Sequence, residues 1–341
     1  MSDHPHISVL LPAYNAAEAL PAALESLLTQ RTARPFEIVA VDDGSTDATP
    51  QVLAAAARRD PRVRPVRLSH GGLVAALNAG LAHCRGAYIA RMDADDISLP
   101  DRLERQAALL DADPGTGVVS SLVAFGGDAA RQAGYAHHVA WQNRLLTHRE
   151  LSLWRFVDAP MAHPSVMFRR ELPERFGAYR DGDFPEDFEL WLRWLERGVR
   201  LAKIPETLLV WNDPPQRLSR SDARYAPEAF YRTKAAYLAR WLAAHNPFHP
   251  EILAWGSGRV SRQRWQLLCA CGVRIRAYVD ISPRRIGQRI HGLSVLAPAG
   301  LPPQGTAFVV AGVARRDAHE VILSRLGEQG YALGRDAIFM S

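Results

Sequence analysis

The segment Ile89-Ala90-Arg91-Met92-Asp93-Ala94-Asp95-Asp96 joins an apolar run to three acidic residues. An extended chain directs residues i and i+2 to the same side, so Asp93 and Asp95 can converge on one object. If the apolar run is a strand of an α/β sheet, both carboxylates lie at its carboxyl edge, where such sheets bind ligands. Their repulsion raises their pKa values unless a hard cation such as Mg²⁺ or Mn²⁺ relieves it. A solvated turn is the alternative, because Asp is common in turns.

Apolar runs and helix-like periods alternate on both sides of this segment, which predicts an α/β fold with a mostly parallel sheet flanked by helices. Strands are expected at 6–12, 36–41, 63–68, 87–90, 118–125, 163–168 and 201–211. Helices are expected at 16–30, after Asp47, after Gly72, after Ser98 as N-cap, and at 186–197 and 225–245. Residues 126–160 read as a loop followed by an irregular helix.

The segment Asn246-Pro247-Phe248-His249-Pro250 interrupts the pattern and predicts a domain boundary, with domains at 1–245 and 246–341. The tail restarts with strands expected at 252–255, 275–279 and 307–312, which indicates a small Rossmann-like domain. Its Gly256-x-Gly258-x-x-Ser261 lacks the third glycine of the dinucleotide fingerprint, whereas Asp280 stands where a ribose-binding acid would. Ligand binding and a structural role both remain open for this domain.

Composition narrows the class of protein. The 341 residues are 48% hydrophobic and 23% charged, as in soluble globular proteins. The net charge of +5 resides in the tail, where 12 arginines face 6 acidic residues from Asn246 onward. This surplus permits an anionic partner, but no basic run with interleaved aromatic residues indicates a nucleic acid. Three cysteines without a Cys-x-x-Cys pair argue against zinc or a disulfide framework.

Cellular location is expected to be cytoplasmic. The cysteine content suits a reducing compartment. The first residues lack the basic and apolar regions of a signal peptide, and no apolar stretch is long enough to span a bilayer. The helix expected at 225–245 carries aromatic and basic residues, so it either packs between domains or lies on the inner face of an anionic membrane.

Five motifs in the first 200 residues resemble those of the family-two glycosyltransferases, which have the GT-A fold. They are Leu11-Pro12-Ala13-Tyr14-Asn15, Val41-Asp42-Asp43-Gly44-Ser45-Thr46-Asp47, Leu77-Asn78-Ala79-Gly80, Arg91-Met92-Asp93-Ala94-Asp95-Asp96 and Glu186-Asp187-Phe188-Glu189-Leu190-Trp191. Each motif alone is weak, but they occur in the order and at the spacing of the family. The resemblance covers about residues 6–225.

The resemblance implies a role for each matching residue. It places the donor nucleotide against Pro12, Ala13, Tyr14, Asp42, Asp43, Asn78 and Asp93. It gives the cation to Asp95 with Asp93, the catalytic base to Asp187, and the acceptor side to His163 and Glu186. Arg220 is a candidate clamp on the diphosphate, because a guanidinium donates forked hydrogen bonds to phosphate.

Each of these assignments has a structural alternative. Asp42 and Asp43 can form an Asx turn, and Asn78 can serve helix packing. Glu186 and Asp187 also suit a helix N-terminus, where negative charge is favourable. His163 can be a buried structural histidine, and Arg220 can belong to a solvated basic loop. Asp96 is either an outer partner of the cation site or a cap for the following segment.

The expected activity is an inverting, metal-assisted hexosyl transfer from a nucleotide sugar to an acceptor hydroxyl. UDP-sugars are the favoured donors, Mn²⁺ or Mg²⁺ the cofactor, and a saccharide or lipid-linked acceptor of surface polysaccharide or glycolipid synthesis the partner. A nucleotidyltransferase is an alternative, but Pro12-Ala13-Tyr14-Asn15 does not supply the Gly-rich loop it needs. A nucleotide-sugar-binding regulatory protein is another, disfavoured by intact acids at 93, 95 and 187. The sugar, the linkage and the oligomeric state are not specified.

Overall fold

The computed structural model describes residues 5–214, 217–315 and 317–341. Contacts within the chain divide it into two compact units. The first unit consists of Met1–Ser152, Ala159–Gly182 and Glu189–Asp222, and the second of Leu153–Asp158, Asp183–Phe188 and Ala223–Ser341. Two short segments of the N-terminal part therefore group with the C-terminal unit. The domain boundary expected at residue 246 stays a prediction.

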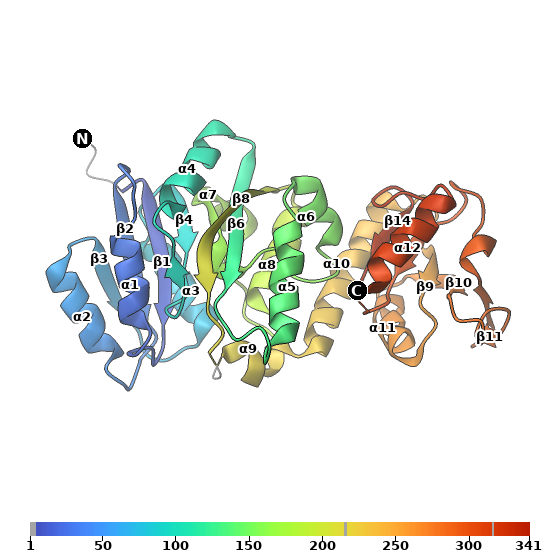
Figure 1. The fold of residues 1–341 in the computed structure, drawn as a ribbon, viewed down its shortest axis with the longest axis horizontal. Coiled ribbons are helices and arrows are strands. Elements are labelled where there is room, and N and C mark those ends of the chain that lie inside the picture. The colour runs from blue at the N-terminus through green and yellow to red at the C-terminus, as the bar shows by residue number, and fades with distance from the viewer. Residues whose placement is uncertain (1–4, 215–216, 316) are drawn as a thin grey trace. The chain divides into compact units, whose positions relative to one another are not determined.

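The first unit is built on an eight-stranded sheet with the order β3-β2-β1-β4-β7-β6-β8-β5 (Figure 1). Its strands are β1 (Ile7–Ala13), β2 (Phe36–Asp42), β3 (Val63–Arg67), β4 (Tyr88–Arg91), β5 (Ile97–Ser98), β6 (Thr116–Phe125), β7 (Met167–Arg169) and β8 (Arg200–Trp211). Strands β3, β2, β1 and β4 are parallel to one another, and β6 is parallel to β8. The short strands β7 and β5 pair antiparallel with their neighbours. The expected α/β fold with a mostly parallel sheet is confirmed.

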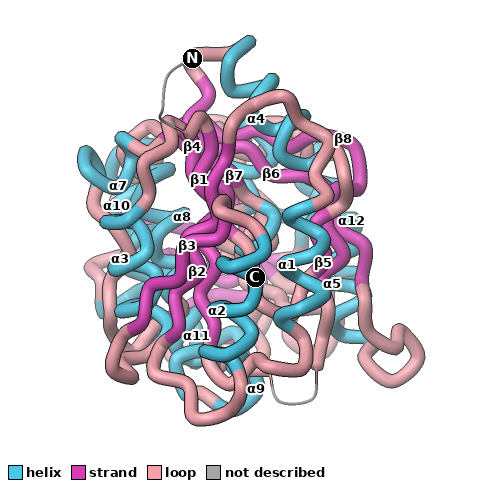
Figure 2. Tube along the Cα trace, turned by 90° about the vertical axis from the view of Figure 1, so that its left-hand side faces the viewer, coloured by secondary structure: helices cyan, strands magenta, loops and turns pink. Residues whose placement is uncertain are grey.

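Burial explains why these segments form central strands. Every residue of β1 and of β2 is buried, as expected for parallel strands covered by helices on both faces. Strand β3 lies at the sheet edge and alternates between buried and more exposed residues. Figure 2 shows helices on either side of these strands. The carboxyl ends of β1, β2 and β4 consequently meet at one edge of the sheet.

Nine α-helices and one 3-10 helix connect or flank these strands in the described part of residues 5–222. They are α1 (Leu20–Leu28), α2 (Thr49–Arg59), α3 (Leu73–His83), α4 (Arg102–Ala112), α5 (Ala133–Arg144), α6 (His148–Trp154), the 3-10 helix η1 (His163–Ser165), α7 (Glu171–Phe176), α8 (Glu186–Glu196) and α9 (Leu218–Ser221). Helix α1 buries a stripe of apolar residues spaced three and four apart, at Leu20, Ala23, Leu24 and Leu27. The region expected as a loop and an irregular helix contains two regular helices, α5 and α6.

Three local expectations are wrong. The helix expected at 16–30 begins only at Leu20, and Pro21 occupies its first turn, where a missing N–H costs nothing. Ser98 is not an N-cap, because it ends β5 and pairs with Leu209 of β8, and α4 begins at Arg102. Residues 163–165 form a 3-10 helix, so the strand expected at 163–168 is limited to β7.

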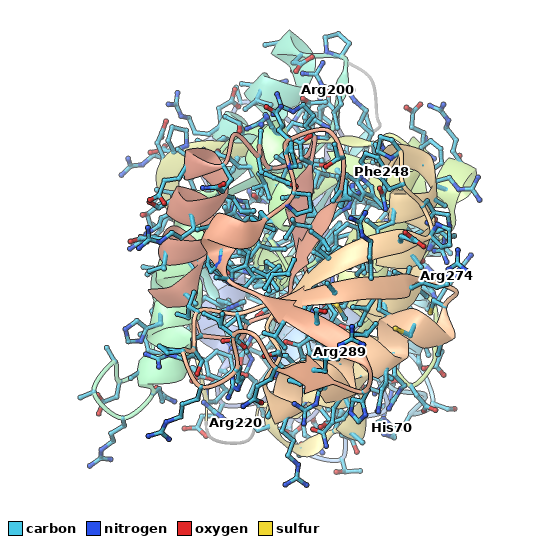
Figure 3. The ribbon with its side chains drawn as sticks, turned by 90° about the vertical axis from the view of Figure 1, so that its right-hand side faces the viewer. His70, Arg200, Arg220, Phe248, Arg274 and Arg289 are labelled. Carbon is cyan, nitrogen blue, oxygen red and sulfur yellow. The ribbon has the colours of Figure 1, made fainter. Side chains whose placement is uncertain are left out.

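The second unit has a six-stranded sheet with the order β11-β12-β10-β9-β13-β14. Its strands are β9 (Glu251–Trp255), β10 (Arg274–Val279), β11 (Arg289–Ile290), β12 (Leu293–Leu296), β13 (Val309–Ala311) and β14 (Ala337–Phe339). Its helices are α10 (Pro227–His245), α11 (Arg259–Ala270) and α12 (Asp317–Glu328), with short 3-10 turns η2 (Ala223–Tyr225) and η3 (Pro298–Gly300). Figure 3 labels Arg274 on β10 and Arg289 on β11. The chain leaves β9 first to one side and then to the other, which is the order of a doubly wound Rossmann-like sheet.

Asp280, the acid that follows β10, is engaged within the protein. Its Oδ2 accepts hydrogen bonds from the main-chain N–H and the hydroxyl of Ser257, and its Oδ1 accepts one from the N–H of Ser282. Arg285 completes the set at 3.1 Å from Oδ2. These contacts lower the pKa of Asp280 against the opposing effect of burial. Binding of a nucleotide by this unit stays a prediction.

Several apolar residues of helix α10 are buried, among them Tyr237, Leu238 and Leu242. Its Lys234 is also buried, and the ammonium donates to the carbonyl oxygens of Val157 and Met340. Burial lowers the pKa of Lys234 to about 8. None of the helices in the described residues is long and apolar enough to cross a membrane. Peripheral membrane contact through this helix stays a prediction.

Candidate active site

Three carboxylates gather immediately after β4. Asp93, Asp95 and Asp96 each place one oxygen within 4.8 Å of the other two. The turn that brings them together is closed by a hydrogen bond from the N–H of Asp96 to the carbonyl of Asp93, at 3.4 Å. Asp96 is fully buried, whereas Asp93 and Asp95 are partly exposed. The convergence expected for Asp93 and Asp95 is therefore present, and it includes Asp96.

Crowding and burial oppose ionisation of this cluster. The pKa of Asp95 is raised to about 6, first by burial and then by the negative charge of Asp93. The pKa of Asp96 is also raised, by burial and by the charges of both neighbours. A cation bound between the carboxylates would relieve these costs, since each carboxylate then faces positive charge.

The donor set fits a hard divalent cation. Asp93 and Asp95 offer partly exposed oxygens, which are the ligand atoms Mg²⁺ and Mn²⁺ prefer. Asp96 is anchored differently, because its Oδ1 accepts a hydrogen bond from the main-chain N–H of Asn212 at 2.8 Å. Its buried Oδ2 has no hydrogen-bond partner among the described residues. Asp96 is therefore the member of the cluster that is buried and hydrogen-bonded to the main chain of the protein.

Asp42 and Asp43 lie where β1 and β2 end side by side, because Ala13 pairs with Asp42 across the two strands. Both oxygens of Asp43 are engaged: they accept the main-chain N–H groups of Gly71 and Gly72, each at 2.9 Å. Asp43 thus shapes the loop before α3 in this structure. Asp42 is buried, and its Oδ2 has no hydrogen-bond partner among the described residues. That oxygen lies 3.6 Å from Nε of Arg67. Contact of Asp42 with a nucleobase stays a prediction.

An exposed aromatic surface adjoins this pair of acids. Tyr14, which follows the buried residues Pro12 and Ala13, is 46% exposed and stacks on His70 with ring centroids 4.2 Å apart. His70 is held in turn by Asp43, whose Oδ2 lies 2.9 Å from Nδ1. The sequence offered no signal for His70 beyond its position before Gly71-Gly72. Contact of the exposed Tyr14 ring with a nucleoside stays a prediction.

His163 and Asn78 are joined through Tyr179, a residue that the sequence did not single out. Nε2 of His163 and the hydroxyl of Tyr179 form a hydrogen bond of 2.8 Å. Asn78 donates from Nδ2 to the carbonyl of Tyr179 at 2.9 Å, and its Oδ1 accepts the N–H of Tyr179 at 3.1 Å. Burial and then the charge of Arg91 lower the pKa of His163, which favours the neutral imidazole. Both residues are structurally engaged here, and their contact with substrate stays a prediction.

Arg220 belongs to a small basic cluster with Arg217. Both guanidinium groups lie against the fully buried carboxylate of Asp213 and over the ring of Tyr135. Arg220 also donates to the carbonyl of Pro214 at 2.6 Å. The positive charge of Arg217 acts to lower the pKa of Asp95. In this structure the guanidinium of Arg220 is paired with the carboxylate of Asp213. Its predicted contact with a diphosphate stays a prediction.

Glu186 and Asp187 begin α8, in a segment that groups with the second unit. The hydroxyl of Tyr225 donates to Oε2 of Glu186 at 2.6 Å. Oδ1 of Asp187 accepts the N–H of Phe188 at 2.7 Å. Glu186 is buried, whereas Asp187 is partly exposed. Of the pair, Asp187 is therefore the carboxylate with access to solvent.

The mixed sheet, with acids at the carboxyl ends of β2 and β4, has the arrangement of the GT-A fold. Residues 8–177 match the sequence model of the family described as Glycosyl transferase family 2. The chain belongs to this family, as the expected resemblance predicted. Its enzymatic class is therefore that of a glycosyltransferase, which disfavours the nucleotidyltransferase alternative.

Two relatives illustrate the family. The chain is 32% identical over 208 residues to the amylovoran biosynthesis glycosyltransferase AmsE of Erwinia amylovora, covering 59% of this chain and 74% of AmsE. It is 30% identical over 232 residues to EpsE of Bacillus subtilis (strain 168), covering 66% of this chain and 80% of EpsE.

A solved structure shares the fold. TarS of S. aureus (residues 1–349), determined in complex with UDP-GlcNAc, superposes with a TM-score of 0.55 and 20% identity. The superposition covers 78% of this chain and 71% of that one. This likeness supports the GT-A fold assigned from the sheet.

Proposed function

We propose that this glycosyltransferase moves a sugar from a nucleotide sugar to an acceptor hydroxyl with the help of a divalent cation. The observation that carries the proposal is the cluster of Asp93, Asp95 and Asp96 at the carboxyl end of β4. Carboxylates this close require a counter-charge, and Mg²⁺ or Mn²⁺ commonly share their shell between such carboxylates and substrate phosphates. A nucleotide sugar brings the diphosphate that completes such a shell.

The nucleoside is proposed to lie against the ends of β1 and β2. The exposed ring of Tyr14 offers a stacking surface, and Asp42 offers an acceptor for a base N–H. TarS, which shares the fold, was determined with UDP-GlcNAc, and this supports a UDP-sugar as the donor. Asp93 is proposed to bind the ribose side. Arg220 would exchange its contact with Asp213 for one with the diphosphate.

The cation is proposed to bind Asp95 together with Asp93. When bound, it acts as a Lewis acid that stabilises the charge developing on the leaving diphosphate. The acceptor hydroxyl must lose a proton, and a partly exposed carboxylate can accept it. Asp187 is the proposed base. Glu186, held by Tyr225, and His163 are proposed on the acceptor side. A single displacement by the hydroxyl inverts the anomeric centre.

The acceptor is proposed to be a growing saccharide or a lipid-linked sugar. AmsE acts in amylovoran biosynthesis by its name, and WbnJ of Escherichia coli, 29% identical over 232 residues, in O-antigen biosynthesis. WbnJ is matched over 86% of its length and over 66% of this chain. These relatives support a role in surface polysaccharide or glycolipid synthesis.

The test is release of nucleoside diphosphate from a panel of UDP-, GDP- and dTDP-sugars by the full chain with Mn²⁺. We expect Asp95→Asn and Asp187→Asn each to reduce turnover by at least a hundredfold. Only Asp95→Asn should also weaken donor binding. Asp183→Asn, which changes an exposed acid four residues before Asp187, is the matched control and should leave the rate unchanged. If no nucleoside diphosphate is released from any donor of the panel, with or without added saccharide or lipid-linked acceptors, the proposal is refuted.

A further inference from the structure

The guanidinium of Arg91 is buried and contacts the carboxylate cluster. Arg91 is the last residue of β4 and is only 2% exposed. Its Nη1 contacts Oδ1 of Asp93, and its Nε has no hydrogen-bond partner among the described residues. Burying the charge of Arg91 costs free energy, and the contact with Asp93 offsets part of that cost. Arg91 and Asp93 therefore depend on each other.

The main chain around Arg91 fixes where its side chain starts. Its N–H donates to the carbonyl of Val166 at 2.9 Å. Its own carbonyl accepts a hydrogen bond from Nη2 of the fully buried Arg102 at 2.6 Å. The Nε of Arg102 donates to Gln106 at 3.1 Å rather than to a carboxylate. The two arginines therefore have different contacts. Arg102 binds the carbonyl at the end of β4, and Arg91 contacts the acid cluster.

The charges of the cluster have a consequence for cation binding. Three carboxylates lie together, and Arg91 neutralises one of them by direct contact. A free divalent cation bound by Asp93 would lie close to the positive charge of Arg91, because Nη1 of Arg91 contacts the same carboxylate. It must also share Asp93 with that guanidinium. A cation that arrives with a diphosphate carries its own compensating negative charge and is repelled less.

We propose that Arg91 is a positioning residue that serves as the built-in counter-charge of the cation site. It holds Asp93 in place when no cation is bound, and it weakens the binding of a free divalent cation relative to a cation–diphosphate complex. The site accordingly selects the metal–nucleotide complex over the metal alone. This inference rests on the proposed function, because it assumes that the cluster receives a cation and a diphosphate.

The first test measures Mn²⁺ binding to the full chain by calorimetry, without nucleotide and then with UDP. Arg91→Gln removes the charge and keeps a hydrogen-bonding side chain, whereas Arg91→Lys keeps the charge. We expect Arg91→Gln to bind free Mn²⁺ at least tenfold more tightly than the wild-type chain, and Arg91→Lys to stay within threefold. Arg105→Gln is the matched control, because Arg105 is an exposed arginine of the same unit that pairs with Glu206.

The second test separates a counter-charge from an ordinary structural role. Arg91→Gln should unfold at a lower temperature than the wild type in EDTA, because the carboxylates lose their neutralising partner. Saturating Mn²⁺ should close at least half of that gap, since the cation replaces the missing charge. If Arg91→Gln is unfolded in EDTA, Mn²⁺ should restore its fold. A gap that Mn²⁺ leaves unchanged, or a variant that Mn²⁺ does not refold, overturns the inference.

The outcomes distinguish the two proposals. A wild-type chain that binds no Mn²⁺ even with UDP present refutes the metal-assisted function and the role of Arg91 together. If the wild type binds Mn²⁺ with UDP, but Arg91→Gln binds free Mn²⁺ no more tightly than the wild type, only the role of Arg91 fails. Tighter binding in Arg91→Gln with unchanged binding in Arg105→Gln supports it.

Discussion

Removal of Arg193 provides a stringent test of how the site is held in place. Arg193 lies on α8 and is 3% exposed. Its guanidinium donates to the carbonyls of Gly177 and Ala178, both at 2.7 Å, and to the buried carboxylate of Glu189. The main chain held in this way leads directly into Tyr179, which binds His163 and Asn78. Arg193 therefore contributes both to the stability of this unit and to the position of Tyr179.

The expected size of the effect follows from burial. Arg193→Leu removes the buried cationic partner of the Glu189 carboxylate. The exposed Arg180, at 3.4 Å, then remains paired with this carboxylate. Removing one partner of a buried ion pair typically costs about 3–5 kcal/mol. For a unit of this size, each kcal/mol lowers the melting temperature by about 2–4 °C, which predicts a drop of about 6–20 °C.

Denaturant and thermal unfolding of the single and double variants would measure this effect. The double variant Glu189→Leu/Arg193→Leu removes the stranded carboxylate and should recover part of the lost stability. Gln142→Ala is the control, because Gln142 is buried but does not contact this ion pair: combined with Arg193→Leu, it should not recover any of the lost stability. A loss below about 1 kcal/mol for Arg193→Leu, or a double variant that is no more stable than Arg193→Leu, would refute this reasoning.

Three further predictions concern ionisation, thiol reactivity and close packing. Asp95 has a raised pKa of about 6 and must lose its proton to bind a cation. The affinity for Mn²⁺ should therefore fall about tenfold for each pH unit below 6. Equal affinities by calorimetry at pH 5 and pH 7 would contradict this. Two of the three cysteines are exposed, whereas burial raises the pKa of the Cys84 thiol to about 12, so a colorimetric thiol assay at pH 8 should count two thiols before unfolding and three afterwards. A Cβ at Gly86 would lie 2.6 Å from a main-chain nitrogen of β1, so Gly86→Ala should cost about 1–3 kcal/mol by urea unfolding, whereas Gly134→Ala, with open space around it, should not be destabilised by contact.

Local sequence was sufficient to place the sheet and its acidic edge. Continuous apolar runs that end in Asp, as at Val41-Asp42 and Met92-Asp93, indicate buried strands with polar residues at the carboxyl end. Because parallel strands end at one edge, the strand pattern alone groups the acids after β2 and β4. The same reasoning predicted the helices between these strands.

Long-range pairing explains what the sequence could not predict. Ser98 has the residue type of an N-cap, but hydrogen bonding with β8, more than 100 residues away, places it in a strand. Asn78 and Tyr179 are 101 residues apart, and nothing local links them. The burial of Arg91 is equally invisible in the sequence, because arginine is usually exposed. Each of these features depends on contacts that form only after the chain has folded.

The most direct test of the central claim is the binding of UDP to the wild-type chain and to Asp95→Asn, measured by calorimetry in Mn²⁺ and in EDTA. If the cluster after β4 joins a cation to the diphosphate, Mn²⁺ should tighten UDP binding at least tenfold in the wild type and should have no effect in Asp95→Asn. UDP affinity that is the same in Mn²⁺ and EDTA, or a response to Mn²⁺ that survives Asp95→Asn, would contradict the account.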